Sequence, residues 1–314
     1  MKRRNFVQTL SGGLIFLGAL PTSATTLRSK ETGEMFFKIS LAEWSLHKTL
    51  FAKKMTNLDF AAKAKNDFGI EAIEYVNQFF KDKARDKDYL DELNQRADDL
   101  GVQQLLIMVD GEGGLGDPDA KKRKEAIENH FKWVEAAKHL GCHSIRVNAF
   151  GQGTAAEVGS AAVDGLGSLA TFAKDFSINV LVENHGGYSS DGIWLSGVMK
   201  EINMENCGTL PDFGNFCVKR SGGQPWGGEC IEEYDRYKGV SELMPFAKAV
   251  SAKTNDFDSD GNDMKTDFMK MMKIVKDAGF SGYVGIEYEG QDLSEDQGIL
   301  ATKKLLEKVG TALS

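Results

Sequence analysis

Short apolar runs alternate with longer amphipathic stretches along the chain from about residue 36 onwards. In one amphipathic stretch, Glu125–Leu140, four apolar residues recur at three- and four-residue spacing, which places them on one face of a helix. They are Ile127, Phe131, Val134 and Ala137. The apolar runs between such stretches are short and typical of buried strands. They predict eight strands: Phe37–Leu41, Ile70–Val76, Val102–Val109, Ser144–Val147, Asn179–Val182, Cys207–Leu210, Ala249–Ala252 and Gly282–Ile286.

Glycines end several of the predicted helices just before the next strand begins, which is a common helix C-terminal signal. They are Gly69, Gly101, Gly141 and Gly279. Eight strand–helix units over roughly 280 residues predict an α/β fold, a single-domain (β/α)8 TIM barrel. The alternative is an open doubly wound sheet, which usually carries a glycine-rich phosphate loop after its first strand. Here Glu43–His47 follows the first strand instead.

The first 24 residues have the features of an export signal. Lys2, Arg3 and Arg4 form a basic start, a glycine-containing apolar stretch covers Leu10–Leu20, and small residues follow in Pro21–Ala24. The arginine pair followed by Asn-Phe-Val resembles a twin-arginine signal, and an ordinary secretory signal is the alternative. No cysteine lies near the cleavage point, so we expect no membrane anchor.

The predicted organisation is therefore a twin-arginine signal peptide over 1–24, a short linker over 25–35 and a catalytic barrel over 36–314. Twin-arginine substrates cross the membrane folded, which suits a protein that acquires a metal in the cytoplasm. We expect a periplasmic protein. A homo-oligomer is compatible with the sequence, which contains no feature that decides it.

Composition and charge exclude some classes of function for this chain. The 314 residues are 41% hydrophobic and 27% charged, as in ordinary soluble proteins, and the net charge is -8. An acidic protein repels phosphate backbones, so nucleic acid is not an expected partner. The four cysteines are better interpreted as buried small apolar residues than as a disulfide framework, with a Cys217–Cys230 bridge as the less favoured alternative.

Polar residues follow five of the predicted strands, where the chemistry of a TIM barrel is placed. Carboxylates come after strands five, six and eight, and ionised carboxylates that share a cavity usually do so around a divalent cation. Oxygen-rich ligands favour Mn²⁺, Mg²⁺ or Zn²⁺. The residues at these strand ends include Arg146, Asn148, Glu183, Asn184, His185, Asp212, Asn215, Lys253, Glu287 and Glu289.

Three of these segments resemble the xylose isomerase-like TIM-barrel superfamily of sugar isomerases, epimerases and inosose dehydratases. They are Val182–Gly187, Asp212–Asn215 and Gly285–Gly290. The resemblance covers nearly the whole mature chain. It implies metal ligands at Glu183, Asp212 and Glu287, and a small sugar or polyol as substrate.

The strand-seven segment departs from that superfamily. Ser251 stands where a histidine is usual, although Lys253 matches the family lysine. The fourth ligand is then Ser251 through water, Asn255, Asp256 or His185. Asn215 likewise takes the place of a common substrate-binding histidine, and an amide can still hydrogen-bond a sugar hydroxyl.

The reaction expected from such a site is proton transfer next to a carbonyl. A base must remove the proton, and a cation must stabilise the oxygen that becomes negative. Glu183 and Glu287 are the expected proton-transfer carboxylates, with Glu289 as the alternate. Lys253 and Arg146 can polarise the carbonyl or bind a phosphate, and structural ion pairs are the alternative interpretation of both.

Further substrate contacts are expected from aromatic and polar residues at the strand ends. Trp44 and Trp226 can stack on a sugar ring. Hydroxyl contacts are expected from His47, Asn148, His185, Asn215 and Glu289. His130 and His139 lie in a predicted helix and are expected at its surface, and the irregular segment Phe213–Glu232 is expected to form a long loop over the site.

Three other functions fit parts of the sequence. A polyol dehydratase would use the same metal and a similar base. A DNA-repair nuclease on this fold needs many more metal-binding histidines than the five present, and the acidic charge disfavours it. A non-catalytic sugar-binding barrel is consistent with the missing strand-seven histidine.

Overall fold

The computed structural model describes residues 34–223 and 227–314. The predicted signal peptide, most of the linker and Trp226 lie outside the described residues. All eight predicted strands are present within a few residues of their expected bounds. They are β1 (Lys38–Ala42), β2 (Ala72–Val76), β3 (Gln103–Met108), β4 (Ser144–Val147), β5 (Asn179–Glu183), β6 (Cys207–Leu210), β9 (Val250–Thr254) and β10 (Tyr283–Tyr288).

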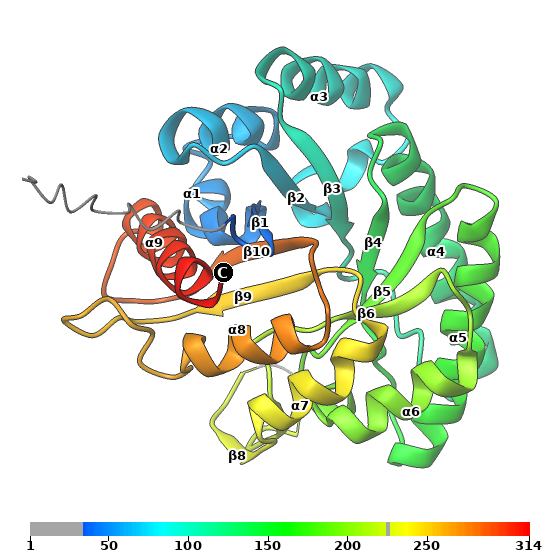
Figure 1. Cartoon of the computed structure of the whole chain (residues 1–314). Helices are drawn as coiled ribbons and strands as arrows, with labels where there is room; N and C mark the ends of the chain where they lie inside the picture. The colour runs from blue at the N-terminus through cyan, green and yellow to red at the C-terminus, as the bar shows by residue number, and fades with distance from the viewer. Residues whose placement is uncertain (1–33, 224–226) are drawn as a thin grey trace, which may run out of the picture. The chain divides into compact units, whose positions relative to one another are not determined.

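These strands form one parallel sheet in the order β6-β5-β4-β3-β2-β1-β10-β9. Two isolated parallel bridges, Thr209 to Ala247 and Asp212 to Ser251, join the segments of β6 and β9. The sheet therefore curves round on itself as a (β/α)8 barrel, and the helices lie outside it (Figure 1). The single-domain TIM-barrel prediction is confirmed.

The helices are α1 (His47–Phe51), α2 (Phe60–Phe68), α3 (Lys87–Leu100), α4 (Ala120–His139), α5 (Ala155–Lys174), α6 (Gly192–Ile202), α7 (Arg236–Leu243), α8 (Phe268–Asp277) and α9 (Glu295–Leu313). Local sequence explains their ends. At the start of α5, Thr154 and Glu157 form a capping box. After α3, Gly101 adopts a left-handed conformation with φ 64°, which glycine reaches without the steric penalty of a side chain. In the described part of the chain, no helix is long and apolar enough to cross a membrane.

Strand alternation gives the barrel two different surfaces. Outward residues such as Ile73, Ile107 and Val182 join the large apolar core beneath the helices. Inward residues such as Leu106 and Leu181 form a much smaller apolar cluster. The remaining inward positions toward the carboxyl ends are polar and charged, and this is the part of the barrel that positions the candidate site.

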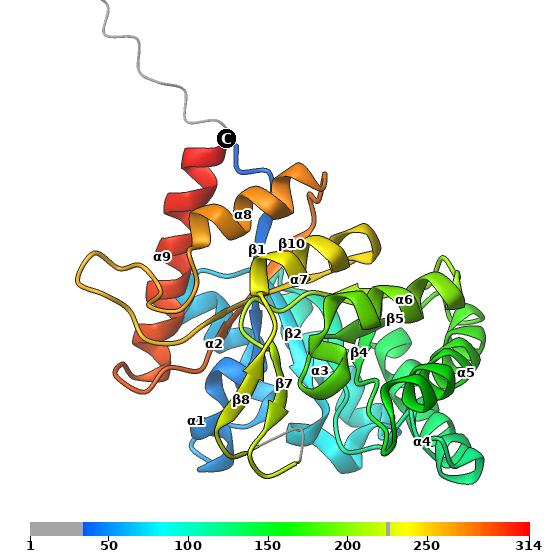
Figure 2. The same ribbon diagram turned by 90° about the horizontal axis from the view of Figure 1, so that it is seen from below.

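The segment expected to be an irregular loop contains a hairpin. Strands β7 (Cys217–Arg220) and β8 (Cys230–Glu233) pair antiparallel, and Figure 2 shows them at the same end of the barrel as α1. A disulfide joins Cys217 to Cys230. The less favoured alternative therefore holds for this pair, because the hairpin brings their Cα atoms to 5.8 Å. Cys142 and Cys207 are buried and unbridged, as expected.

Candidate active site

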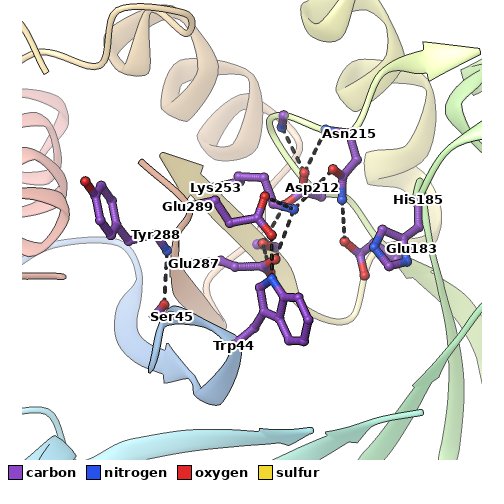
Figure 3. Close-up of polar contacts among 12 residues, drawn as sticks. Trp44, Ser45, Glu183, His185, Asp212, Asn215, Lys253, Glu287, Tyr288 and Glu289 are labelled. Atoms are coloured by element: carbon purple, nitrogen blue, oxygen red, sulfur yellow. Dashed lines mark hydrogen bonds and ion pairs between the residues drawn. The ribbon is translucent and has the colours of Figure 1, made fainter. Parts of the chain in front are cut away.

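Charged side chains from five strands or the residues after them converge at the carboxyl end of the barrel, and Figure 3 shows those of Glu183, Asp212, Lys253 and Glu287. Because successive side chains on a strand point to opposite faces, Glu287 and Glu289 on β10 and its continuation share one face. Ser251 and Lys253 share the same face of the neighbouring strand β9. The cluster is completed by Arg146 from β4, Glu183 from β5 and Asp212 after β6.

Three buried carboxylates form the centre of this cluster. Oxygens of Glu183, Asp212 and Glu287 all lie within 4.8 Å of one another. The Ser251 hydroxyl lies 2.6 Å from Asp212 Oδ2 and 3.0 Å from Glu287 Oε2. A hydroxyl carries one proton and can donate it to only one of the two carboxylates. A proton held by the cluster, or a bound cation, satisfies the other.

Two protein cations neutralise part of this charge. Lys253 Nζ lies 3.0 Å from Glu287 Oε1 and 3.4 Å from Glu289 Oε2, and it donates to Asn215 Oδ1. Arg146 Nε lies 2.8 Å from Glu183 Oε2. Burial alone would lower the pKa of Lys253, but the carboxylates of Asp212 and Glu287 outweigh burial and raise the pKa well above its ordinary value. Lys253 therefore stays charged.

The acidic residues respond to burial in different ways. Burial raises the pKa of Asp212 to about 6, although Lys253 opposes the shift. Burial also raises the pKa of Glu183, and Arg146 opposes that shift. Burial opposes ionisation of Glu289 as well, but Lys253 and the hydrogen bond from the Trp44 indole outweigh it and lower its pKa. Carboxyl groups with different proton affinities are thus packed side by side, as acid–base catalysis requires.

The donor set fits a hard divalent cation better than zinc. The available ligands are carboxylate oxygens and the Ser251 hydroxyl, and oxygen ligands suit Mg²⁺ and Mn²⁺. Among the four alternatives for a fourth ligand, Ser251 directly contacts the carboxylates. Asn255 is instead bonded to Asp263 and Lys265. Asp256 accepts from the backbone N–H groups of residues 291 and 292.

A polar relay orients His185 beside the cluster. Asn148 Nδ2 donates to Asp110 Oδ1 at 2.6 Å, so its amide oxygen faces His185 Nδ1 at 2.8 Å. An amide oxygen only accepts, so His185 carries its proton on Nδ1. Burial and the nearby Arg146 lower the pKa of His185 well below its usual range, which keeps the ring neutral. Asp110 itself stays ionised because Arg146, 2.7 Å away, outweighs burial and lowers its pKa.

Trp44 and His47, both expected to contact the substrate, take different positions relative to the cavity. Trp44 lines the cavity, and its indole N–H donates to Glu289. His47 does not line the cavity; its ring stacks on Trp44 with centroids 4.8 Å apart, and its Nδ1 bonds the Trp44 carbonyl. His47 therefore packs against the Trp44 ring and helps to hold it in position at the cavity wall.

The cavity has a volume of about 690 Å³ and reaches beyond the expected site residues. It is lined by residues that the sequence analysis predicted (Trp44, Arg146, Asn148, His185, Asn215, Lys253, Glu287 and Glu289) and by others that it missed (Gln78, Asp110, Glu112, His130, Phe150 and Arg220). Glu183 and Asp212 are buried and do not belong to the cavity lining. Asp110 directly follows β3, so the strand-end rule could have found it.

The expectation that His130 lies at the surface is wrong. Its side chain is 2% exposed, its Nδ1 bonds the Ala126 carbonyl, and it lines the cavity. The helix α4 that carries it is packed against the barrel through the same face as Trp133 and Val134. A histidine on that face is indistinguishable from a surface histidine by composition alone.

Comparisons with known proteins agree with this architecture. The sequence profile of the family described as xylose isomerase-like TIM barrel matches residues 61–309. No curated protein matches the chain. Solved structures with the same fold include the IOLI protein with a bound zinc atom (TM-score 0.66, 17% identity, 87% of this chain and 98% of that chain). A second is D-psicose 3-epimerase with D-tagatose from Clostridium cellulolyticum H10 (TM-score 0.65, 12% identity, 87% of this chain and 99% of that chain). A third is 3-keto-D-glucoside 4-epimerase from E. coli (TM-score 0.61, 14% identity, 88% of this chain and 100% of that chain).

Proposed function

This chain belongs to the xylose isomerase-like TIM-barrel family, and from that premise we propose that it is a sugar isomerase or epimerase that moves a proton next to a carbonyl. One observation carries the proposal. The Glu287 carboxylate faces the cavity with the Lys253 ammonium 3.0 Å away. A base and a positive charge are then available to the same bound substrate. Two of the structural neighbours are epimerases, which supports this class of reaction.

In the proposed reaction Glu287 removes the proton, because it is the member of the carboxylate cluster that lines the cavity. We assign the second proton-transfer step to Glu183, with Glu289 as the alternate. Glu183 lies under Asn215, whose Nδ2 donates to it at 2.9 Å, whereas Glu289 lines the cavity directly. Lys253 is placed to stabilise the carbonyl oxygen as it becomes negative.

We include a divalent cation, Mn²⁺, Mg²⁺ or Zn²⁺, held by Glu183, Asp212 and Glu287, in the proposal. When bound, such a cation adds positive charge for the developing oxyanion. The buried position of the three carboxylates supports this assignment, since carboxylates packed so closely repel without a neutralising charge. A hydroxylated substrate is oriented in the same proposal by Asn148, His185 and Asn215.

We also propose that the protein is exported to the periplasm through the signal in residues 1–24. Disulfides persist in oxidising compartments and are rare in the cytosol. The Cys217–Cys230 bridge supports export independently of the signal.

The test is solvent-proton exchange, since it does not require the product to be known. The purified protein, loaded in turn with Mg²⁺ and Mn²⁺, is incubated in D₂O with D-fructose, D-psicose and D-tagatose, and NMR follows deuterium entry next to the carbonyl. We expect exchange in the wild type and a loss of roughly 10²- to 10⁴-fold in Glu287→Gln. Glu232→Gln, in the exposed hairpin strand β8, is the matched control and should keep full activity.

Other outcomes have defined meanings. Loss of exchange in Glu289→Gln but not in Glu183→Gln would move the second role to Glu289. Release of water from the sugar without epimerisation would indicate a dehydratase. Binding without exchange at any metal concentration would contradict an enzyme and favour a non-catalytic sugar-binding barrel.

A further inference from the structure

A second group of polar side chains lines the cavity beside the carboxylate cluster. Asp110 lies two residues after β3, Glu112 follows it in the β3–α4 segment, and His130 projects from α4. The proposed reaction uses none of the three. Arg146 joins the two groups, because its Nη1 lies 2.7 Å from Asp110 Oδ1 and its Nε lies 2.8 Å from Glu183 Oε2.

His130 presents an acceptor nitrogen to the cavity. Its side chain is 2% exposed, and its Nδ1 lies 2.7 Å from the Ala126 carbonyl oxygen, one turn earlier in α4. A carbonyl oxygen only accepts, so Nδ1 carries the proton and Nε2 keeps a lone pair. Burial lowers the pKa of His130, which keeps the ring neutral. Because Nδ1 is bonded to its own helix, Nε2 is the ring nitrogen available to a ligand.

The β3–α4 segment holds Glu112 next to His130 in a fixed orientation. Glu112 Oε1 accepts from Trp133 Nε1 at 2.8 Å and lies 2.9 Å from Lys132 Nζ. The Glu112 backbone carbonyl accepts from Asn129 Nδ2 at 3.3 Å. Residues three apart share a face of a helix, and both Trp133 and His130 are buried on α4. Glu112 is therefore packed against the turn of α4 that carries His130.

Three acceptor atoms of this group have no donor among the described residues. Asp110 uses Oδ1 for its bonds from Arg146 and Asn148. Glu112 uses Oε1 and His130 uses Nδ1, which leaves Asp110 Oδ2, Glu112 Oε2 and His130 Nε2. None of these atoms is among the enclosed, unbonded side-chain atoms in the described part of the chain, so each is open to the cavity that its residue lines. A ligand in this position has to supply hydrogen-bond donors.

The carboxylates of this group already have cations beside them. Arg146 pairs with Asp110, and Lys132 pairs with Glu112. Arg220 adds a further positive charge to the cavity lining. The group therefore calls for donors that bring no charge of their own, and hydroxyl groups are such donors.

We propose that Asp110, Glu112 and His130 form a subsite that binds adjacent hydroxyl groups of the substrate by accepting their hydrogen bonds. The reacting carbons lie at Glu287, and the hydroxyl groups bound here are on the carbons beyond them. This inference rests on the proposed function, because that function defines which carbons react. It adds the residues that recognise the rest of a polyhydroxylated substrate.

Titration calorimetry on the Mg²⁺-loaded protein tests which hydroxyl groups donate. The probes are D-fructose, its deoxy forms that lack the hydroxyl group at C4, C5 or C6, and the matching forms with fluorine in its place. Fluorine accepts a hydrogen bond weakly and donates none. At two adjacent carbons we expect the deoxy and the fluoro forms to bind equally weakly, each roughly tenfold below fructose.

Two substitutions at position 130 form a matched pair. The side-chain oxygen of glutamine reaches the position of Nε2, whereas that of asparagine stops near Nδ1. We expect His130→Asn to bind fructose roughly tenfold more weakly and to lose discrimination against one of the fluoro forms, and His130→Gln to retain both properties. His139→Gln is the control and should change no affinity, because His139 is bonded to Asp91 and does not line the cavity.

Nitrogen-15 NMR of the histidine-labelled wild type requires no variant. Saturating D-fructose should shift the Nε2 signal of His130 upfield, because a hydrogen bond then forms at its lone pair, and should leave the signal of His139 in place.

Two kinds of failure can be told apart. An unchanged His130 signal at saturating fructose, fluoro forms that all bind as tightly as fructose, or an undiminished affinity in His130→Asn would overturn the subsite and leave the proposed reaction standing. Failure of every sugar to bind, together with no proton exchange in D₂O, would overturn both proposals.

Discussion

At the scale of single residues, position 251 determines which cations the carboxylate cluster can hold. The sequence resemblance places a histidine there, and this chain has Ser251, whose hydroxyl contacts Asp212 and Glu287. A neutral hydroxyl is a weak ligand for zinc, which prefers nitrogen and sulfur. One residue thus shifts the expected metal preference toward hard cations.

We therefore expect Ser251→His to raise zinc affinity on the order of 100-fold, because it adds an imidazole beside three carboxylates. Calorimetry with Zn²⁺ and Mn²⁺ measures the change directly. Ser251→Ala is the control, since it removes the hydroxyl without adding a ligand. Equal zinc affinities in the wild type and the histidine variant would show that no metal binds to the cluster beside position 251.

A second residue-scale feature is the buried acid Glu74 inside the barrel. Ser40 donates to its Oε1 at 2.6 Å, and Oε2 has no hydrogen-bond partner among the described residues. A Cβ at Gly285 would lie 2.7 Å from Oε1, so a glycine is needed opposite this carboxyl. Burial raises the pKa of Glu74 from 4.5 to about 7.

This shift predicts the pH dependence of stability. The folded state binds the Glu74 proton more tightly than the unfolded state, so the free energy of unfolding falls as pH rises from 4.5 to about 7. The full effect is about 3 kcal/mol. Glu74→Gln should be more stable than the wild type by about that amount at pH 9 and nearly equal to it at pH 4.5.

Urea unfolding at pH 4.5, 7 and 9 measures this difference. Glu205→Gln, at an exposed position after α6, is the matched control and should follow the wild type at every pH. A constant difference between Glu74→Gln and the wild type across the range would contradict a buried protonated Glu74.

At the scale of elements, the β7–β8 hairpin depends on its disulfide. Strand β8 is exposed along its length, so little apolar burial holds it to the barrel. A disulfide that closes a loop of this size stabilises by about 3 kcal/mol in the chain-entropy account. The hairpin also carries Arg220, which lines the cavity.

We expect reductant to accelerate tryptic cleavage after Lys219 and Arg220 of β7 in the wild type, because reduction lets the exposed strand β8 separate from β7. The Cys217→Ser, Cys230→Ser double variant should be cut quickly with or without reductant. Peptide mapping by mass spectrometry identifies the sites. Cleavage rates in the wild type that do not respond to reductant would show that packing, rather than the disulfide, holds the hairpin.

At the scale of the whole molecule, export and oxidation are linked in the proposal. Replacing both Arg3 and Arg4 by lysine should retain the precursor in the cytoplasm, because twin-arginine signals depend on the arginine pair. In the retained protein Cys217 and Cys230 should stay reduced. Cell fractionation and alkylation mass shifts measure the two effects, with Lys2→Ala as the control. Undiminished export of the lysine variant would favour the ordinary secretory route.

Much of the architecture could be predicted from local pattern. Strand and helix periodicity, with glycines such as Gly101 at helix ends, predicted the eight strands and their order. Parallel strands place their carboxyl ends at one edge of the barrel, so residues after strands five, six and eight had to approach one another. The convergence of Glu183, Asp212 and Glu287 follows from that rule alone.

Which residues line the cavity, and which side chains pair with one another there, was decided only by the tertiary structure. His130 and Phe150 reach the cavity through helix packing and a loop path that leave no local pattern. The Cys217–Cys230 pairing depends on a hairpin turn, because spacing along the chain does not determine the distance in space. The sequence by itself determined the barrel and the edge where the carboxylates meet, since both follow from periodicity. The ion pairs and the shape of the cavity required the fold, since they depend on contacts between distant segments.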